Sequence, residues 1–469
     1  MQKRFKFYIA LFFVTLAACT VGKNYQRPDL PVPQEFRGVT TSDTSSIADI
    51  EWKQFFTDTT LQGLISRGIA YNYDLQLAIK RMDEAKQRVK QAKLLQLPEL
   101  NLQATAQTNN PSNNSLNGIS LKSFLEKNHL EDYTVAANLS WEADIWGKIR
   151  RQKEAALAEY LKTSEAAKAV QTQLVADIAQ GFFNMLMLDE QLDIAKKNLI
   201  ITDSTLFITR LQRDGGEVTT LAVQQAEVQR QTTALLIPQL ENDIAVQENA
   251  LSILTGALPG DISRNIKLSD FNVPDHFATG LPAAVVSRRP DVRAYEMSLV
   301  GANAEVGIAQ AYMYPALNIT ATGGLNSFKA SNWFNIPASL FGIVAGSLAE
   351  PVFQHRELKT QFEIAKIQRD EAVIQFRQSV LNAAGEVSNA LITTDKLKTQ
   401  QQIASAQVDT LQHAIKNARL LFKSGMANYL EVLTAQRNAL LAELNLASIQ
   451  REQLGAMVEL YRSLGGGWK

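Results

Sequence analysis

Two stretches of this sequence resemble each other at a constant spacing along the chain: DLQLAIKRMDEAKQRVKQAKLLQLPELNLQAT (residues 74–105) and DVRAYEMSLVGANAEVGIAQAYMYPALNITAT (residues 291–322). Two later segments, GEVTTLAVQQAE from Gly216 and GMANYLEVLTAQ from Gly425, also share spaced identities. Self-similarity over this distance is the signature of a duplicated unit, so the sequence predicts two internal repeats of roughly 200 residues each. Identical residues in the first pair of stretches include Ala85/Ala302, Val89/Val306, Ala92/Ala309, Pro98/Pro315 and Leu100/Leu317.

Each repeat is predicted to contain a helix, a strand, a loop, a second strand, a very long helix, a turn and a return helix. The first helix should run from Thr60 to Leu97 and stop at Pro98, because the residue before a proline disfavours the helical region. The segments that follow alternate apolar and polar residues with a period of two, which indicates strands with one apolar face. These four expected strands begin at Leu100, Tyr133, Leu317 and Ser339, and a polar loop joins the first two.

Strands of about ten alternating residues with an aromatic residue near one end are typical of transmembrane β-barrels. Strands of a water-exposed hairpin with one wet face are the alternative. Four strands cannot close a barrel, and lipid permits no open sheet edge. Membrane strands would therefore require several chains, and this argument alone leaves open whether two copies give eight strands or three give twelve.

The two long helices are predicted from the absence of proline over Lys148–Asp214 and Arg356–Ser424. A helix of this length extends on the order of 100 Å. Its apolar residues recur at threes and fours, as in a coiled coil, so it must pack laterally against similar helices. Glycines then turn the chain into return helices over residues 217–255, interrupted at Pro238, and residues 428–464.

The N-terminus has the layout of a bacterial export signal. Basic residues precede an apolar stretch, Phe7–Ala17, that is too short to span a bilayer. The segment LAAC then resembles a lipobox, in which the chain is cleaved before Cys19 and this residue is acylated. Cys19 is the only cysteine in 469 residues, so it has no partner for an internal disulfide. An ordinary signal peptide with an incidental cysteine is the alternative.

Composition argues against several other classes of protein. Lysine plus arginine equals aspartate plus glutamate, 47 each, so nothing favours nucleic acid as a partner. The four histidines are scattered, and the one Glu126-x-x-His129 spacing lies in the predicted polar loop. No phosphate-binding glycine loop and no G-x-S-x-G motif occur. We therefore expect no enzyme activity, no cofactor and no metal site.

Several segments resemble the outer-membrane efflux protein family (TolC-like): SRRPDVRAYE from Ser287, NYLEVLTAQRNAL from Asn428 and LYRSLGGGW from Leu460. The lipobox followed by VGKNYQRPDLPVP resembles the family's lipoprotein branch, which serves resistance-nodulation-division (RND) pumps. The resemblance implies a mainly α homotrimer with a twelve-stranded transmembrane β-barrel and a twelve-helix periplasmic α-barrel. The expected parts are a signal peptide (1–18), an extended N-terminal segment (19–59), a first repeat (60–257), an equatorial linker (258–281) and a second repeat (282–469).

The family's function is a passive outer-membrane channel in a tripartite efflux system. The implied partners are further copies of the chain, a periplasmic adaptor, an inner-membrane RND-type pump and outer-membrane lipid. Two alternatives stay open: a lipid-anchored coiled-coil scaffold without a pore, and the duct of a type I protein secretion system, against which the lipobox argues mildly. The substrate is not specified by the sequence, since drugs, metal ions, bile salts and solvents are all compatible.

The resemblance places a periplasmic gate near the turn of the second repeat. Leu430, Thr434 and Arg437 fall on one helix face. The family commonly has an acidic residue where Thr434 stands, so a simple acid–arginine latch is not expected here. Glu431, or Asp214 and Glu217 at the neighbouring tip, could supply the acid, or these charges could merely solvate the helix ends. The expected adaptor-docking tips are Asp214, Gly215, Gly216, Glu217 and Gly425.

Overall fold

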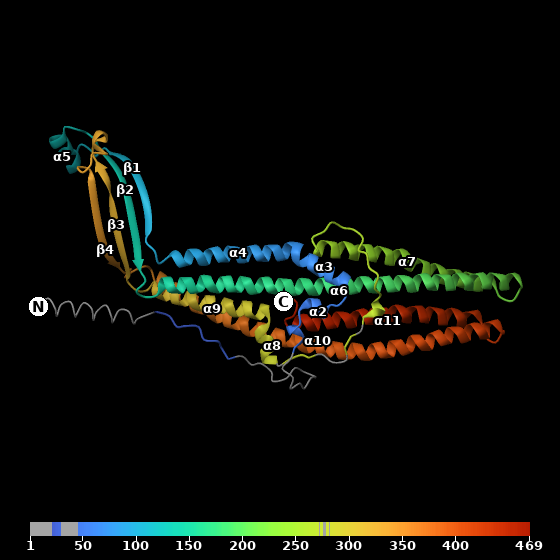
Figure 1. The fold of residues 1–469 in the computed structure, drawn as a ribbon. Coiled ribbons are helices and arrows are strands. Elements are labelled where there is room, and N and C mark those ends of the chain that lie inside the picture. Colours follow the sequence, from blue (N-terminus) through green and yellow to red (C-terminus); the bar gives the residue numbers. More distant parts are fainter. Residues whose placement is uncertain (1–20, 30–45, 272, 275–277, 281) are drawn as a thin grey trace. The chain divides into compact units, whose positions relative to one another are not determined.

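The computed structural model describes residues 21–29, 46–271, 273–274, 278–280 and 282–469. Residues 1–18 and Cys19, for which a signal peptide and lipidation are expected, lie outside the described residues. The chain is mainly helical with one small sheet, and it divides into two compact units (Figure 1). The sheet unit comprises the described parts of residues 1–28, 83–161 and 297–374. The helical unit comprises the described parts of residues 29–82, 162–296 and 375–469.

The sheet unit contains all four strands expected from the alternating segments. They form one antiparallel sheet in the order β1 (Glu99–Asn109), β2 (Leu130–Ala143), β3 (Ala316–Ser327) and β4 (Leu340–Ala349). The connection between β1 and β2 was expected to be only a polar loop, but it contains helix α5 (Leu116–Leu125). Ser115 begins this helix because its hydroxyl accepts a hydrogen bond from the Gly118 N–H at 3.1 Å. A single helical turn, η3 (Ala330–Asn332), lies between β3 and β4.

The register of the sheet aligns the apolar residues of all four strands on one face. Leu100 of β1 lies opposite Leu139 of β2, which lies opposite Ala321 of β3, which lies opposite Val344 of β4. Side chains alternate between the faces of a sheet, so every second residue from each of these shares the face. That face therefore carries an almost entirely apolar set: Leu100, Leu102, Ala104, Val135, Ala137, Leu139, Leu317, Ile319, Ala321, Val344 and Leu348.

The opposite face of the sheet is polar over β1, β2 and β3. Asn138 donates to the Gln103 side chain at 3.3 Å and accepts from the Thr322 hydroxyl at 2.8 Å. The large apolar side chains on this face are Leu130 at the start of β2 and Phe341 and Ile343 of β4. β1 and β4 are the outer strands, and in the described part of the chain no strand pairs with their outer edges.

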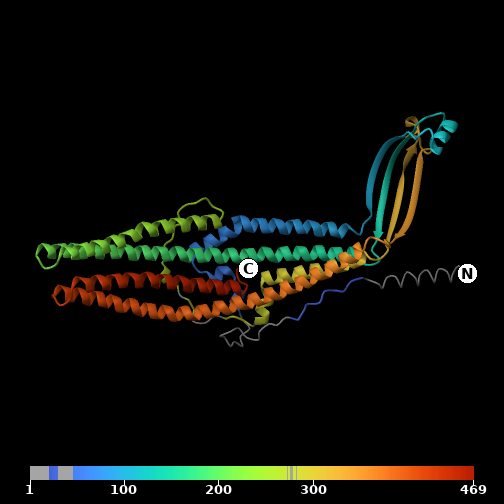
Figure 2. The same ribbon diagram turned by 180° about the vertical axis from the view of Figure 1, so that it is seen from behind.

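The helical unit is built from two long antiparallel hairpins that lie side by side (Figures 1 and 2). The first is α6 (Lys148–Asp214) with α7 (Thr220–Leu254), and the second is α10 (Glu357–Lys423) with α11 (Tyr429–Ser463). These bounds match the proline-free stretches expected to be helical. α6 and α10 begin in the sheet unit and continue into the helical unit.

Shorter elements pack around these hairpins or connect them. Their bounds are η1 (Ile47–Asp49), α2 (Trp52–Phe55), α3 (Thr59–Tyr71), α4 (Tyr73–Leu94), η2 (Leu268–Asp270), α8 (Pro282–Arg288) and α9 (Pro290–Ala311).

The core of the helical unit is aromatic and aliphatic. Phe182, Met185 and Val458 are fully buried at 0% exposure. Tyr461 stacks on Phe55 with ring centroids 4.0 Å apart, and its hydroxyl donates to the Ile50 carbonyl at 2.7 Å. Burial raises the pKa of Tyr461 to about 12, so this hydroxyl stays protonated as a donor.

Two helix predictions are wrong in detail. The segment 60–97 forms two helices, α3 and α4, because Asn72 adopts an extended conformation between them. The Asn72 side chain accepts a hydrogen bond from Leu75 N at 2.9 Å, which begins α4, and donates to Leu254 O at 3.0 Å. Pro238 does not interrupt α7, which continues through it. A proline removes only one backbone hydrogen bond from a helix. The other hydrogen bonds of a long helix, together with its packing against neighbouring helices, can keep it continuous.

The RRPD segment of the family resemblance forms a buried ion cluster in the helical unit. Arg289, 3% exposed, lies between α8 and α9 and binds Asp291 through two nitrogens, at 3.0 and 2.7 Å. It also contacts Glu386 of α10 at 2.8 Å and the Ser463 carbonyl at 2.9 Å. Arg462 reaches the same Glu386 oxygen at 3.0 Å. The buried guanidinium of Arg289 thus joins the start of α9 to α10 and to the end of α11.

Replacing Asn72 with alanine should lower the stability of the helical unit. The substitution removes the α4 cap and leaves the Leu254 carbonyl without its donor, at a cost of about 1–2 kcal/mol. The thermal unfolding temperature of the purified protein measures this. Asn242→Ala is the control, because Asn242 is exposed on α7 and, within the described residues, its side chain hydrogen-bonds only to its neighbour Asp243. Equal effects of the two substitutions would contradict the capping role.

The Arg289 cluster should make stability depend on pH in the acidic range. Burial raises the pKa of Asp291, but the hydrogen bond and charge of Arg289 outweigh it and hold this pKa below its ordinary value of 3.8. A lowered folded-state pKa stabilises the protein above the ordinary value, and this stability is lost as the pH falls through the folded-state pKa. Asp291→Asn should therefore lower the unfolding temperature at pH 7, with a gap to wild type that closes as the pH drops below about 4. A gap independent of pH would refute this.

Candidate functional site at the hairpin tips

The two hairpin turns have the same geometry. α6 ends at Asp214 and the chain reverses through Gly215 and Gly216, while α10 ends at Lys423 and the chain reverses through Gly425. Gly216 and Gly425 have φ angles of +77° and +74°, the left-handed conformation that only glycine adopts without strain. In each turn a backbone N–H closes a loop back to the helix: Glu217 to the Gln212 carbonyl at 2.8 Å, and Met426 to the Leu421 carbonyl at 2.9 Å.

The charged residues expected at the first tip do not meet the second hairpin. Asp214 is exposed and pairs with its own neighbour Arg213 at 2.5 Å. Glu217 is exposed as well, and within the described residues it forms no ion pair. On the second hairpin, Glu431 lies in the first turn of α11, where its N–H is capped by the Asn428 side chain at 3.2 Å. The structure thus brings none of these three acids to Arg437.

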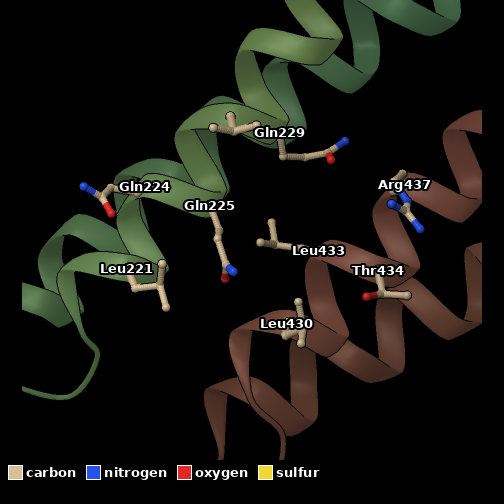
Figure 3. A pocket seen from close by; sticks show the side chains of 9 residues that line it. Leu221, Gln224, Gln225, Gln229, Leu430, Leu433, Thr434 and Arg437 are labelled. Atoms are coloured by element: carbon tan, nitrogen blue, oxygen red, sulfur yellow. The ribbon is translucent and has the colours of Figure 1, made fainter.

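Leu430, Thr434 and Arg437 do come together, as their spacing predicts. They line one wall of a groove of about 580 Å³ between α11 and α7, and Leu433 lies between the walls (Figure 3). Glu431 is not part of this lining. The opposite wall is supplied by α7 through Leu221, Gln224, Gln225, Val228 and Gln229.

Contacts that the sequence did not predict hold the two hairpins together beside this groove. The Tyr429 hydroxyl at the start of α11 donates to Gln225 Oε1 of α7 at 2.6 Å. Gln436 of α11, 2% exposed, donates to the Thr205 hydroxyl of α6 at 2.9 Å. A small apolar cluster with members from both hairpins adds to these contacts: Leu206, Val223, Ala226 and Leu433. Only the polar character of Gln436 on an otherwise apolar helix face could have signalled such a contact.

The groove carries a positive charge and no negative charge. Arg437 is its only charged lining residue, and within the described part of the chain no carboxylate pairs with it. The nearby acids of the first hairpin are already engaged across α6 and α7: Glu227 with Arg210 at 2.6 Å and Asp203 with Arg230 at 2.9 Å.

A further ion cluster lies in the linker region of the helical unit. Arg264 binds Asp189 of α6 and Glu248 of α7, and the Glu248 contact measures 2.5 Å. Arg264 thereby connects the chain segment between α7 and α8 to the first hairpin. Among the described residues, no three His, Cys, Asp or Glu side chains gather as metal ligands would. None of the described helices is long and apolar enough to cross a membrane.

Two long helical hairpins, an amphipathic four-stranded sheet and near-identical glycine turns define the class of outer-membrane efflux ducts. Comparison with known proteins agrees. The model of the outer membrane efflux protein family matches residues 64–257 and again residues 281–466, so the chain belongs to this family.

Relatives and solved structures match over almost the full length. The probable outer membrane lipoprotein SilC of Salmonella typhimurium is 28% identical, over 98% of each chain. The cation efflux system protein CusC of Escherichia coli is 28% identical, over 100% of this chain and 99% of its own. The open-state crystal structure of the MtrE outer membrane channel of Neisseria gonorrhoeae has a TM-score of 0.85 at 26% identity, over 96% of this chain and 99% of that one. This chain is an outer-membrane efflux protein, so the efflux function and the outer-membrane location expected from the sequence are confirmed.

Placing alanine at Gly216 should destabilise the turn although there is room for it. No atom lies within 4 Å of the position that the alanine Cβ would take, so the cost is the left-handed backbone alone, about 1–2 kcal/mol. Gly385→Ala inside α10 also meets open space, but its helical backbone should gain about 0.5–1 kcal/mol. Hydrogen exchange at the tips and the unfolding temperature test both variants. A stabilising Gly216→Ala would contradict the turn geometry.

Proposed function

We propose that three copies of this chain form a continuous passive duct, which carries substrates from an inner-membrane RND-type pump and a periplasmic adaptor to the cell exterior. The observation that carries the proposal is the sheet: its apolar residues are in register on one face, and its two outer strands have no partner within the described part of the chain. Such a sheet matches a segment of a barrel wall, with its apolar face toward lipid and its polar face toward a water-filled lumen.

Closure of the barrel follows from the hydrogen bonds that lipid cannot supply. In the hydrocarbon region each unsatisfied backbone group costs several kcal/mol, so the outer edges of β1 and β4 must find partners. In our proposal β4 of one chain pairs with β1 of the next. The number three, which makes twelve strands, comes from the family resemblance.

The long helices support the same assembly below the membrane. α6 and α10 leave large apolar side chains exposed in the single chain, for example Ile200 at 68%, Phe207 at 62% and Leu420 at 59%. Helices with apolar flanks on two sides need neighbours on both sides. In our proposal α6, α7, α10 and α11 of three copies form a twelve-helix α-barrel.

The tips are proposed to close this duct and to receive the adaptor. Leu430, Thr434 and Arg437 would narrow the periplasmic aperture, with Glu431 beside Leu430 in the first turn of α11. The exposed tip residues would dock the adaptor, whose binding would separate the hairpins at the Tyr429–Gln225 contact. These docking residues are Asp214, Gly215, Gly216, Glu217 and Gly425.

The remaining parts of the chain complete the proposal. Residues 1–18 are a signal peptide, Cys19 carries acyl chains that anchor the protein in the outer membrane, and residues 19–59 join the equatorial region. Residues 60–257 and 282–469 are the two repeats, and residues 258–281 are the linker between them. The two family-model matches, ending at 257 and resuming at 281, support this division.

The two faces of the sheet should respond differently to a charge. Val344 on the apolar face and its neighbour Ala345 on the polar face are both exposed in the middle of β4. Val344→Lys should destabilise the membrane-inserted protein by about 2–4 kcal/mol, whereas Ala345→Lys should be tolerated. The fraction of folded protein recovered in outer membranes measures both. Equal tolerance would contradict lipid contact and favour the pore-free scaffold.

The aperture is tested by conductance. In planar bilayers wild-type protein should show small or flickering currents, and Arg437→Ala should give larger and steadier ones because a bulky charged side chain leaves the constriction. Equal currents would retain the duct but refute Arg437 as a closing residue. No current from either protein, despite a verified trimer, would refute the duct.

A further inference from the structure

The groove between α7 and α11 is lined by four apolar and five polar side chains, and Arg437 is the one charged residue among them. Its polar lining consists of Arg437 and Thr434 on α11 and three glutamines, Gln224, Gln225 and Gln229, on α7. Figure 3 shows the Gln229 amide extending from α7 toward the side of the groove where Arg437 lies.

One of these amides is already oriented by a contact inside the protein. Gln225 Oε1 accepts the hydrogen bond from the Tyr429 hydroxyl at 2.6 Å. Its remaining polar atom, Nε2, carries two N–H donors, and no acceptor in the described part of the chain binds them. Arg437 contributes five more N–H donors in a fixed planar fork, which matches the oxygens of a carboxylate or phosphate group.

We propose that this groove binds anionic groups of the carboxylate or phosphate type, and that it makes the periplasmic aperture selective for anions. This inference rests on the proposed duct, because it assigns a specificity to the site where the duct narrows. Gln225 and Gln229 would hold the anion from α7 while Arg437 holds it from α11.

Assembly would strengthen an interaction that is weak in a single exposed groove. A lone surface charge in water is largely screened, but clefts lined by one sign of charge focus the field and concentrate the opposite ion. Rings of arginine or lysine produce anion-selective pores by this means. Three copies of Arg437 around one axis would make such a ring.

Thr434 is essential to the argument. It precedes Arg437 by three residues on the same helix face, so an acidic side chain there would lie within reach of the guanidinium and neutralise it. Threonine leaves Arg437 without that partner. The nearest acids on α11 are Glu431 and Glu443, each six residues from Arg437 and outside the groove; Glu443 accepts hydrogen bonds from Asn198 and Gln412.

The experiment is the reversal potential of the protein in planar bilayers under a potassium chloride gradient. Wild type should pass chloride in preference to potassium. Arg437→Gln and Thr434→Asp should each reduce the chloride-to-potassium permeability ratio by about twofold or more. Arg419→Gln is the matched control: Arg419 is an arginine of α10 near the same tip, but it lines a different groove and should leave the ratio unchanged.

Inorganic phosphate provides a second readout that needs no current. Phosphorus NMR lines of phosphate should broaden in the presence of wild-type protein in detergent, and Arg437→Gln should require about tenfold more protein for the same broadening. Glu431→Gln should leave this binding at least as strong as in wild type.

The possible failures are distinguishable. A conducting wild type that prefers potassium, or whose selectivity and phosphate binding are unchanged by Arg437→Gln, would overturn the anion groove and leave the duct intact. Absence of conductance in every variant would overturn the proposed duct, and with it the selectivity of its aperture.

Discussion

The unpaired outer edges of β1 and β4 are the constraint on which the rest of the account depends. A sheet whose apolar residues share one face over four strands is suited to lipid, and lipid does not tolerate free backbone N–H and C=O groups. The described part of the chain therefore cannot be complete in a membrane by itself. The exposed apolar side chains of α6 and α10 likewise need neighbouring helices to cover them. In the proposed duct, assembly would satisfy both demands: backbone hydrogen bonds would pair the sheet edges, and side-chain packing would cover the helices.

The two hairpins have the same arrangement of a long helix, a glycine turn and a return helix, but the residues that make contacts differ between them. Asn72 and Arg289 occupy equivalent breaks between two helices, yet the first makes a local cap and the second organises a buried ion cluster. The turns at Gly216 and Gly425 are alike, whereas α7 brings glutamines to the groove and α11 brings Arg437. A site formed by one helix from each hairpin can therefore be asymmetric although the two hairpins have similar turns. This asymmetry allows one helix to contribute charge and the other to contribute oriented amides.

The sequence predicts the long elements well because their signals are local. Absence of proline between glycine turns sets the limits of α6 and α10, and strict alternation identifies the four strands. The sequence analysis does not predict helix α5, the break at Asn72 or the continuity of α7 through Pro238. Single side-chain caps at Ser115 and Asn72 begin α5 and α4, and only the Asn72–Leu254 contact of these is long-range. For the site, helical spacing alone placed Leu430, Thr434 and Arg437 on one wall. The opposite wall and the Tyr429–Gln225 contact join residues about two hundred positions apart, which no local pattern reveals.

The central claim is that each chain supplies four strands to one shared barrel. Electron cryomicroscopy of the lipidated protein in lipid nanodiscs tests it most directly. The account predicts a closed ring in which β4 of each chain is hydrogen-bonded to β1 of the next, with Leu100, Leu139 and Val344 facing lipid. Single chains with unpaired β1 and β4 edges, or a sheet that lies outside the lipid, would contradict it.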